Sequence, residues 1–163
     1  SEALAACGNM LVNVEIKNSG GEACYDPDVA VAAPTIAEMR EHGDASRWII
    51  SSFDWATIRR CRELAPELMT AYLVMNATPE VIEQTAAAGH AAVHPWEPTI
   101  DQEMVDRCHG AGIAINTWTC NDPERLQELA RVGVDAVCTD VPDLALMALG
   151  RRISPAAQWG TRA

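Results

Sequence analysis

A short motif that returns along the chain limits its fold more than any other feature. The motif consists of small residues, then a glycine, then an apolar run, and it stands at residues 86–93, 110–115 and 131–137, with a weaker copy at 6–12. Glycine readily adopts the left-handed backbone conformation that ends a helix, and the apolar run that follows suits a strand. The repeat length of about 22 residues suits one strand, one helix and two short loops. The motif therefore predicts strands that alternate with helices.

Residue types that start helices stand between the predicted strands. They precede stretches of helical periodicity at Asp54, Thr78, Asp101, Asp122 and the Pro142-Asp143 pair. Strands are expected at residues 11–17, 48–53, 70–75, 91–94, 113–119 and 136–139. This alternation predicts an α/β fold of the (β/α) TIM-barrel type, with parallel strands and outer helices. No Gly-x-Gly-x-x-Gly follows a strand, so a dinucleotide-binding fold has no support. Three methionines are expected in the core: Met69, Met75 and Met104.

The chain offers fewer strands than a complete barrel, which has eight. Residues 2–9 already read as the last turns of a helix, so we expect residues 1–150 to form a partial barrel domain whose N-terminal strands are missing. Residues 19–34, with Gly20-Gly21, Pro27 and Pro34, are expected to form one long loop over the strand ends. Residues 151–163 show no periodicity and are expected to be a loose tail.

Composition excludes several classes of partner. The chain has 23 acidic and 12 basic residues, a net charge of −11, which argues against nucleic acid or an anionic membrane as the main partner. No apolar run approaches the roughly 18 residues of a membrane span, and no signal peptide is visible. The six cysteines include no Cys-x-x-Cys pair. We expect them to be reduced packing residues of a cytoplasmic protein, although their even number also permits disulfides.

Catalytic groups of such barrels lie at the carboxyl ends of the strands. The segment 11–18 alternates apolar and polar residues, which puts Glu15 and Lys17 on one face of a strand. A carboxylate and an ammonium so placed mark either a solvated edge strand with a salt bridge or a site for a cation and an anion. Other strand ends carry Ser52, Asp54, Asn76, His94, Trp118, Asn121, Thr139 and Asp140. Of these, His94 suits a hydrogen-bonded structural role or an approach to substrate, and Asp140 is expected to cap the last helix.

Four segments together point to one family. Residues 14–17, 51–54, 117–121 and 133–142 read Val-Glu-Ile-Lys, Ser-Ser-Phe-Asp, Thr-Trp-Thr-Cys-Asn and Gly-Val-Asp-Ala-Val-Cys-Thr-Asp-Val-Pro. In order and spacing they resemble the Glu-Ile-Lys, Ser-Phe, Trp-Thr-x-Asn and closing Gly-Val-Asp…Thr-Asp-x-Pro segments of the glycerophosphodiester phosphodiesterases. The resemblance covers nearly everything from Leu11 to Leu149. It implies a (β/α) barrel that hydrolyses glycerophosphodiesters to an alcohol and glycerol 3-phosphate with a divalent cation, usually Mg²⁺ or Ca²⁺.

The resemblance also assigns roles to three residues. Glu15 matches a metal-binding carboxylate, Lys17 a lysine that contacts phosphate, and Trp118 an aromatic residue that lines the pocket near the glycerol end. The family's His-Arg-Gly strand, Pro-Glu-Asn-Thr turn, Glu-x-Asp pair and second His-Asp are absent. These supply the two histidines that act as general acid and base, together with most metal ligands. The chain therefore offers no catalytic residue, because none of its histidines lies in a matching context: His42, His90, His94 and His109.

The leading hypothesis is thus a metal-dependent phosphodiesterase acting on a small-molecule glycerophosphodiester, with this fragment inactive alone. The alternative is a non-catalytic partial barrel that binds phosphoesters weakly or associates with another chain through its open parallel edges. A third hypothesis is an unrelated phosphate-binding barrel enzyme, such as an isomerase or aldolase. Those enzymes usually hold phosphate on glycine-rich loops after the last strands, which residues 139–142 do not resemble.

Overall fold

Helices and strands alternate along the chain as the motif predicts. The computed structural model describes residues 2–21 and 23–151, so the predicted tail lies outside the described residues except for Arg151. Within this part, one parallel sheet runs in chain order through β1 (Val12–Glu15), β2 (Trp48–Ser52), β3 (Met69–Val74), β4 (Ala92–Pro95), β5 (Ala114–Thr117) and β6 (Ala136–Val137). The α-helices are α1 (Glu2–Ala6), α2 (Ala32–Glu41), α3 (Trp55–Leu64), α4 (Pro79–Ala87), α5 (Gln102–Gly110), α6 (Pro123–Val132) and α7 (Pro142–Ala148). Two short 3-10 helices complete the set, η1 (Ala45–Arg47) and η2 (Glu97–Thr99).

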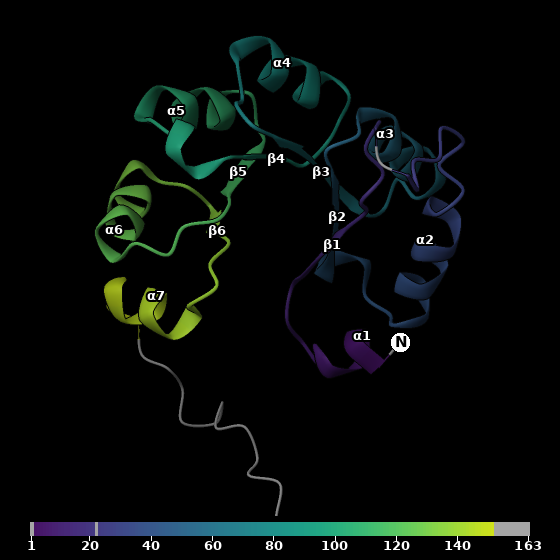
Figure 1. Cartoon of the computed structure of the whole chain (residues 1–163), viewed down its shortest axis with the longest axis horizontal. Coiled ribbons are helices and arrows are strands. Elements are labelled where there is room, and N and C mark those ends of the chain that lie inside the picture. The colour runs from purple at the N-terminus through teal and green to yellow at the C-terminus, as the bar shows by residue number, and fades with distance from the viewer. Residues whose placement is uncertain (1, 22, 152–163) are drawn as a thin grey trace, which may run out of the picture.

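The sheet bends into an arc, with helices α2 to α6 along its outer side (Figure 1). The two edge strands, β1 and β6, pair only with β2 and β5, so the described strands form a half-barrel. Helices α1 and α7 lie at the two open ends of the arc (Figure 1). The predicted barrel-type arrangement of parallel strands with outer helices is therefore confirmed for the described residues.

Local sequence signals explain the helix boundaries. The side chains of Asp54, Asp101 and Asp122 accept hydrogen bonds from the backbone N–H groups three residues on, at 2.7–2.8 Å, and Thr78 makes the same bond at 3.4 Å. The three motif glycines all have positive φ: Gly89 (+75°), Gly112 (+75°) and Gly133 (+94°). After each, the next N–H bonds back to the carbonyl five residues earlier, which closes the helix and turns the chain into a strand.

The hydrophobic core lies between the sheet and the outer helices. Alternate strand residues such as Trp48 and Ile50 on β2 and Ile115 on β5 are fully buried there, against helix residues such as Ile36 and Leu126. The other strand face points to the inside of the arc. Because only one face of each strand meets the helices, the inner face is left for other contacts.

The prediction of one long loop over residues 19–34 is wrong at the C-terminal end of that segment. Helix α2 begins at Ala32, so Pro34 lies in its first turn, where the missing N–H of proline removes no helical hydrogen bond. The preceding loop is tied down by Asn18, whose side chain bonds to the backbone O and N–H of Asp26 at 2.9 and 2.8 Å. The core assignment of methionines is wrong for Met69 and Met75, which are 37% and 55% exposed, while Met104 packs against the core.

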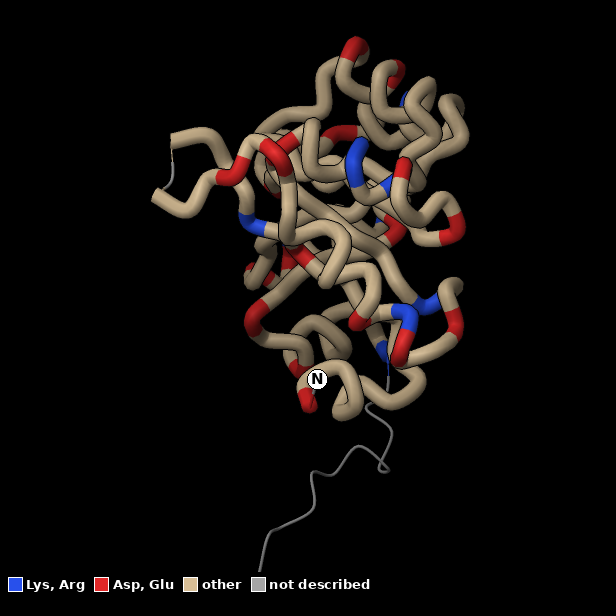
Figure 2. Tube along the Cα trace, turned by 90° about the vertical axis from the view of Figure 1, so that its right-hand side faces the viewer, with Lys and Arg blue, Asp and Glu red and all other residues tan. Residues whose placement is uncertain are grey.

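The surface agrees with the composition. Acidic residues outnumber basic ones in the sequence, and they are spread over the described part of the trace (Figure 2). No helix in the described part of the chain is long and apolar enough to cross a membrane. Cys61, Cys108 and Cys120 are buried free thiols, and burial raises the pKa of Cys61 and of Cys108 to about 11.

Candidate active site

A cavity of about 490 Å³ opens on the inner face of the half-barrel. Every strand contributes to its wall, and the lining continues into the turns after β2, β5 and β6. The lining residues are Asn13, Glu15, Ile49, Phe53, Leu73, His94, Asn116, Thr117, Trp118, Thr119, Ala136, Val137 and Cys138. The cavity therefore lies where a barrel of parallel strands carries its chemistry.

The structure brings together two of the three residues that the resemblance assigns. Glu15 at the end of β1 and Trp118 just after β5 both line the cavity. Lys17 lies two residues beyond Glu15, with an exposed side chain, and is not part of the cavity wall. Strand β1 ends at Glu15, and alternation continued beyond it would put Lys17 on the same side of the chain as Glu15. Lys17 is also the only lysine in the sequence.

Trp118 is held in place from two sides. Its indole Nε1 donates a hydrogen bond of 2.8 Å to the backbone oxygen of His94. Its ring meets the ring of Phe53 edge to face, with centroids 5.4 Å apart and an interplanar angle of 87°. The half-buried indole thus forms a fixed apolar wall next to the more polar residues of β4 and β5.

His94 lines the cavity from β4 and is buried, with 5% of the residue's surface exposed. Its Nε2 lies 2.9 Å from the amide nitrogen of Asn116. The Asn116 amide donates this bond, so the imidazole proton is assigned to Nδ1. Burial lowers the pKa of His94 to about 4, which keeps the ring neutral at pH 7. The ring is a hydrogen-bonded group on the wall, as one of the two sequence interpretations expected.

Several other strand-end residues have structural partners instead of facing the cavity. The buried hydroxyl of Ser52 donates to the backbone oxygen of Ile16 at 2.7 Å, and Asp54 caps α3. Asn76 lines a different cavity, next to the N-terminus of α4. These side chains connect strands and helices around the site and leave its wall to other residues.

The end of β6 is closed by a polar cluster around Asn121. The oxygen of the Asn121 amide accepts from the Thr139 hydroxyl and the Asp140 N–H, both at 2.9 Å, and its nitrogen donates to the Asp140 carboxylate at 2.8 Å. The predicted capping role of Asp140 is wrong, because Val141 is the N-cap of α7 and no side chain caps that helix. The carboxylate is already engaged by the amide of Asn121.

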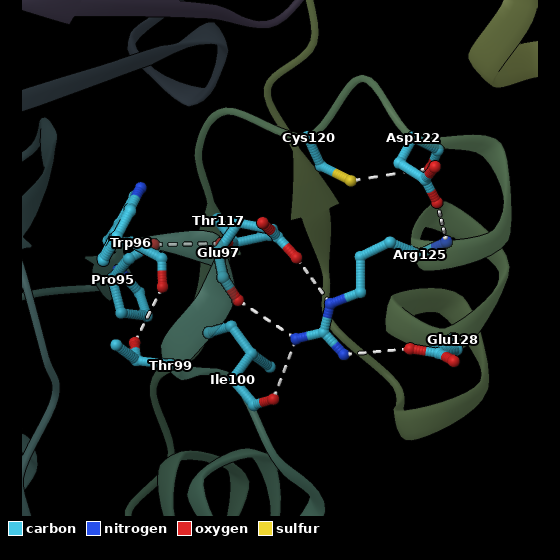
Figure 3. A network of polar contacts seen from close by, with 10 residues as sticks. All are labelled: Pro95, Trp96, Glu97, Thr99, Ile100, Thr117, Cys120, Asp122, Arg125 and Glu128. Carbon is cyan, nitrogen blue, oxygen red and sulfur yellow. Dashed lines mark hydrogen bonds and ion pairs between the residues drawn. The ribbon is translucent and has the colours of Figure 1, made fainter.

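Sequence reasoning missed the network that fixes the loop between β4 and α5 (Figure 3). The Arg125 guanidinium from α6 pairs with the Glu97 carboxylate and donates to the backbone oxygens of Glu97 and Ile100 at 3.1 and 3.0 Å. The Glu97 N–H in turn donates to the backbone oxygen of Trp118 at 2.8 Å. One signal was visible: a cation in the first turn of a helix opposes the helix dipole, so Arg125 needed a carboxylate partner elsewhere.

The described residues do not make a complete metal site. Among them, no group of three or more His, Cys, Asp or Glu side chains could hold an ion, and Glu15 is the one carboxylate on the cavity wall. Magnesium and calcium take six or more oxygen ligands. Glu15 could thus supply one ligand, and the cavity as described does not fit the cation by itself.

Comparison with known sequences identifies relatives along most of the chain. Residues 2–144 match the glycerophosphoryl diester phosphodiesterase family. A glycerophosphodiester phosphodiesterase of Caldanaerobacter subterraneus subsp. tengcongensis is 28% identical over 135 residues, which is 83% of this chain and 54% of that protein. The chain spans about half the length of the relatives it matches.

Solved structures show the same fold. An Oleispira antarctica phosphodiesterase, in complex with the product sn-glycerol-3-phosphate, superposes with a TM-score of 0.74 at 23% identity, over 85% of this chain and 54% of that one. A glycerophosphodiester phosphodiesterase from Parabacteroides distasonis gives a TM-score of 0.77 at 20% identity, over 91% and 61%. At these identities the likeness bears on the fold, and it confirms the barrel type.

Proposed function

This chain belongs to the glycerophosphoryl diester phosphodiesterase family, and on that premise we propose that it carries the substrate-binding part of a site that hydrolyses glycerophosphodiesters to an alcohol and glycerol 3-phosphate. One observation carries the proposal: Glu15 and Trp118, about a hundred residues apart in sequence, line one cavity at the strand ends. The product complex of the Oleispira antarctica relative supports a ligand of this class.

Lys17 would hold the phosphoryl group. The protein carries a net charge of −11, so an anionic substrate needs a local cation to approach the cavity. A lysine ammonium is a compact point charge that interacts with phosphate oxygens and stabilises charge that builds up on them during displacement. The side chain of Lys17 is exposed and forms no ion pair or hydrogen bond with another described residue, so it would be free to turn toward the cavity.

Trp118 and Phe53 would receive the carbon atoms of the glycerol moiety. Their edge-to-face pair gives a rigid apolar wall, since the indole is also bonded to the backbone of His94. A small polyol packs its C–H face on an aromatic ring while its hydroxyl groups need polar partners. His94 and Asn116, on the adjacent strands, line the same cavity and supply such partners.

Glu15 would contribute one oxygen ligand to Mg²⁺ or Ca²⁺. When bound, such a cation polarises a phosphoryl oxygen and neutralises its charge. The described residues offer no other carboxylate at the cavity, so they would not hold the ion by themselves. The resemblance places the remaining ligands, and both histidines for proton transfer, in segments that this sequence does not contain.

The expected division of labour is that this chain binds but does not turn over substrate. His94 is the one histidine on the cavity wall within the described residues, and it is neutral and bonded to Asn116. General acid–base catalysis needs a group that exchanges a proton with the reacting oxygen near the working pH. We therefore expect the chain with Mg²⁺ or Ca²⁺ to leave glycerophosphocholine intact while it binds glycerol 3-phosphate weakly.

The test measures choline release and, separately, glycerol 3-phosphate binding by calorimetry, on the 163-residue chain and its Lys17→Ala variant. The proposal expects no choline release, detectable binding by the parent chain and at least one bound ligand fewer per chain in the variant. Arg131→Ala, which removes one exposed charge from the last turn of α6, is the matched control and should bind like the parent chain. Rapid choline release, or equal binding by the Lys17 variant, would overturn the assignment.

A second candidate, a self-associating module, rests on the open ends of the arc. Large apolar side chains are exposed beside both edge strands: Met10 (60%) and Leu11 (78%) before β1, and Leu144 (47%) and Met147 (68%) on α7. Unpaired strand edges with apolar surroundings favour association. Light scattering during size-exclusion chromatography tests it: a dimer that Leu11→Glu converts to monomer supports this candidate, and a monomeric parent chain contradicts it.

We also propose a cytoplasmic location, since the buried cysteines Cys61, Cys108 and Cys120 are free thiols.

A further inference from the structure

A second cleft lies on the outer side of the half-barrel, away from the inner cavity. It has a volume of about 520 Å³ and is bounded by α3 and by the turn between α4 and β4. Helices α3 and α4 are neighbours along the arc (Figure 1). Its lining residues are Arg59, Arg62, Glu63, Pro66, Ala88 and His90. Helix C-termini and strand N-termini meet here, so this cleft opens at the end of the fold opposite to the candidate active site.

One of the lining residues of this outer cleft, His90, has a buried imidazole nitrogen with no hydrogen-bond partner among the described residues. Only 3% of the surface of His90 is exposed, and its Nε2 makes no hydrogen bond to any described residue. Its Nδ1 lies 2.7 Å from the hydroxyl of Thr70. No other acceptor for the Thr70 hydroxyl is found among the described contacts, so the hydroxyl donates to Nδ1 and the ring proton is on Nε2. A buried N–H donor without an acceptor costs free energy, which a bound ligand with an acceptor atom would recover.

The wall of the outer cleft carries a guanidinium that is equally unused. Arg62 is half-buried and forms no ion pair or hydrogen bond within the described part of the chain, although acidic residues outnumber basic ones by 23 to 12. It lies across the glycine of the α4–β4 turn: a Cβ on Gly89 would be 2.6 Å from the Arg62 Nη2. The glycine, with φ +75°, thus gives the guanidinium room to lie over the turn.

The remaining charges of the outer cleft leave it positive. Arg59 lies on the same wall, and its only described partner is Glu63 at 3.4 Å. Glu63 is the one carboxylate of the lining and is shared with Arg60, also at 3.4 Å, on the outside of the helix. The lining thus holds two guanidinium groups and a neutral imidazole against one engaged carboxylate, and Pro66 and Ala88 add apolar surface.

We propose that this outer cleft binds an oxyanion of the phosphate type, held by Arg59 and Arg62 with the His90 Nε2–H as a third donor. Guanidinium groups match phosphate oxygens with two parallel hydrogen bonds each, and charge-assisted bonds of this kind are the strong ones. The volume exceeds that of a single phosphate, so a phosphate monoester with a small organic part, packed on Pro66 and Ala88, fits the class. This site is independent of Glu15, Lys17 and Trp118 on the inner face.

The experiment titrates inorganic phosphate into the ¹⁵N-labelled chain and follows the imidazole signals of His90 by NMR, with sodium chloride of equal ionic strength as the reference. We expect the His90 Nε2–H signal to shift and saturate with phosphate but not with chloride. Arg62→Ala should weaken the affinity about tenfold, and Arg62→Lys less, while Arg131→Ala leaves it unchanged. Lys17→Ala should also leave it unchanged, which separates this site from the proposed function.

Three outcomes would overturn the proposal. The His90 signals could stay fixed up to saturating phosphate, which would mean that the N–H is satisfied within the protein, for example by the face of the Trp55 ring 5.0 Å away. Arg62→Ala and Arg131→Ala could weaken binding alike, which would mean a general charge effect. Sodium acetate could shift the signals as strongly as phosphate, which would mean that the cleft selects carboxylates instead. Circular dichroism of each variant confirms that it is folded before its titration is interpreted.

Discussion

The indole Nε1 of Trp118 donates to the backbone oxygen of His94 at 2.8 Å, so the end of β5 is fastened to β4 at the point where both line the cavity. The same two strands are joined again by the amide of Asn116 and the imidazole of His94, at 2.9 Å. The aromatic wall of the candidate site is thus set by β4 as much as by its own strand. This coupling determines what substitutions at Trp118 should do.

Trp118→Phe should weaken glycerol 3-phosphate binding about fivefold, the equivalent of one hydrogen bond worth about 1 kcal/mol. The phenyl ring keeps an apolar face, but it cannot donate to His94 and is free to turn. Trp118→Ala removes the wall altogether and should weaken binding by about tenfold or more. Calorimetric titration of both variants measures the effect.

Trp96→Phe is the matched control for this series. Trp96 also follows a strand and is 41% exposed, but it does not line the cavity. The Trp96→Phe variant should bind glycerol 3-phosphate like the parent chain. Equal weakening in Trp96→Phe and Trp118→Phe would show that the site does not use the Trp118 indole.

Arg125→Met should destabilise the chain by about 2 kcal/mol, because it leaves the carboxylate of Glu97 largely buried without its cation. Burial acts to lower the pKa of Arg125, but the hydrogen bonds to Glu97 and Glu128 outweigh it and raise that pKa, so the guanidinium keeps its charge. Removing both partners, in Arg125→Met with Glu97→Gln, should cost less than Arg125→Met alone. Urea unfolding of the two single variants and the double variant measures the coupling, and additive effects would contradict it.

The parts of the fold that sequence predicted are those set by local chemistry. Asp54 and Asp122 cap helices because a carboxylate satisfies the N–H groups of the first turn wherever it stands there. Gly133 ends α6 because few other residues adopt its φ of +94° without strain. These signals need no knowledge of the rest of the chain, and together they were enough for the (β/α) alternation.

The parts that sequence reasoning missed depend on contacts between distant segments. Helix α2 carries a proline in its first turn and follows a loop fixed by Asn18, and neither feature has a periodic signal. The Glu97–Arg125 pair joins residues 28 positions apart. Asp140 has the sequence context of a cap, but the amide of Asn121, 19 residues away, takes its carboxylate instead. Contacts between residues so far apart in sequence are set by the packing of one β/α unit on the next.

Lys17, as the only lysine, permits a direct test of its role by amine acylation. Glycerol 3-phosphate should protect the Lys17 ε-amine from an amine-selective reagent, because an ammonium paired with phosphate is not nucleophilic. Mass spectrometry of the peptide that contains Lys17 measures the extent of labelling with and without ligand. Glycerol alone is the control, since it lacks the phosphate, and it should give no protection. Protection by glycerol equal to that by glycerol 3-phosphate would remove Lys17 from the anion site.

The unfolding free energy should fall as the pH drops from about 6.5 to about 4, with His94 as one source. Burial lowers the pKa of His94 in the folded chain from 6.5 to about 4, so between these values the unfolded chain binds a proton that the folded chain does not. Stability from this source is therefore complete above about pH 6.5 and is lost progressively on acidification, by at most about 3 kcal/mol. Urea unfolding at a series of pH values should show a shallower slope for His94→Gln than for the parent chain, while Arg131→Ala keeps the parent slope. Burial lowers the pKa of His90 to about 4 as well, so part of the slope should persist in His94→Gln. An unchanged slope in that variant would mean that the folded and unfolded chains protonate His94 over the same pH range, and the lowering of its pKa by burial would be wrong.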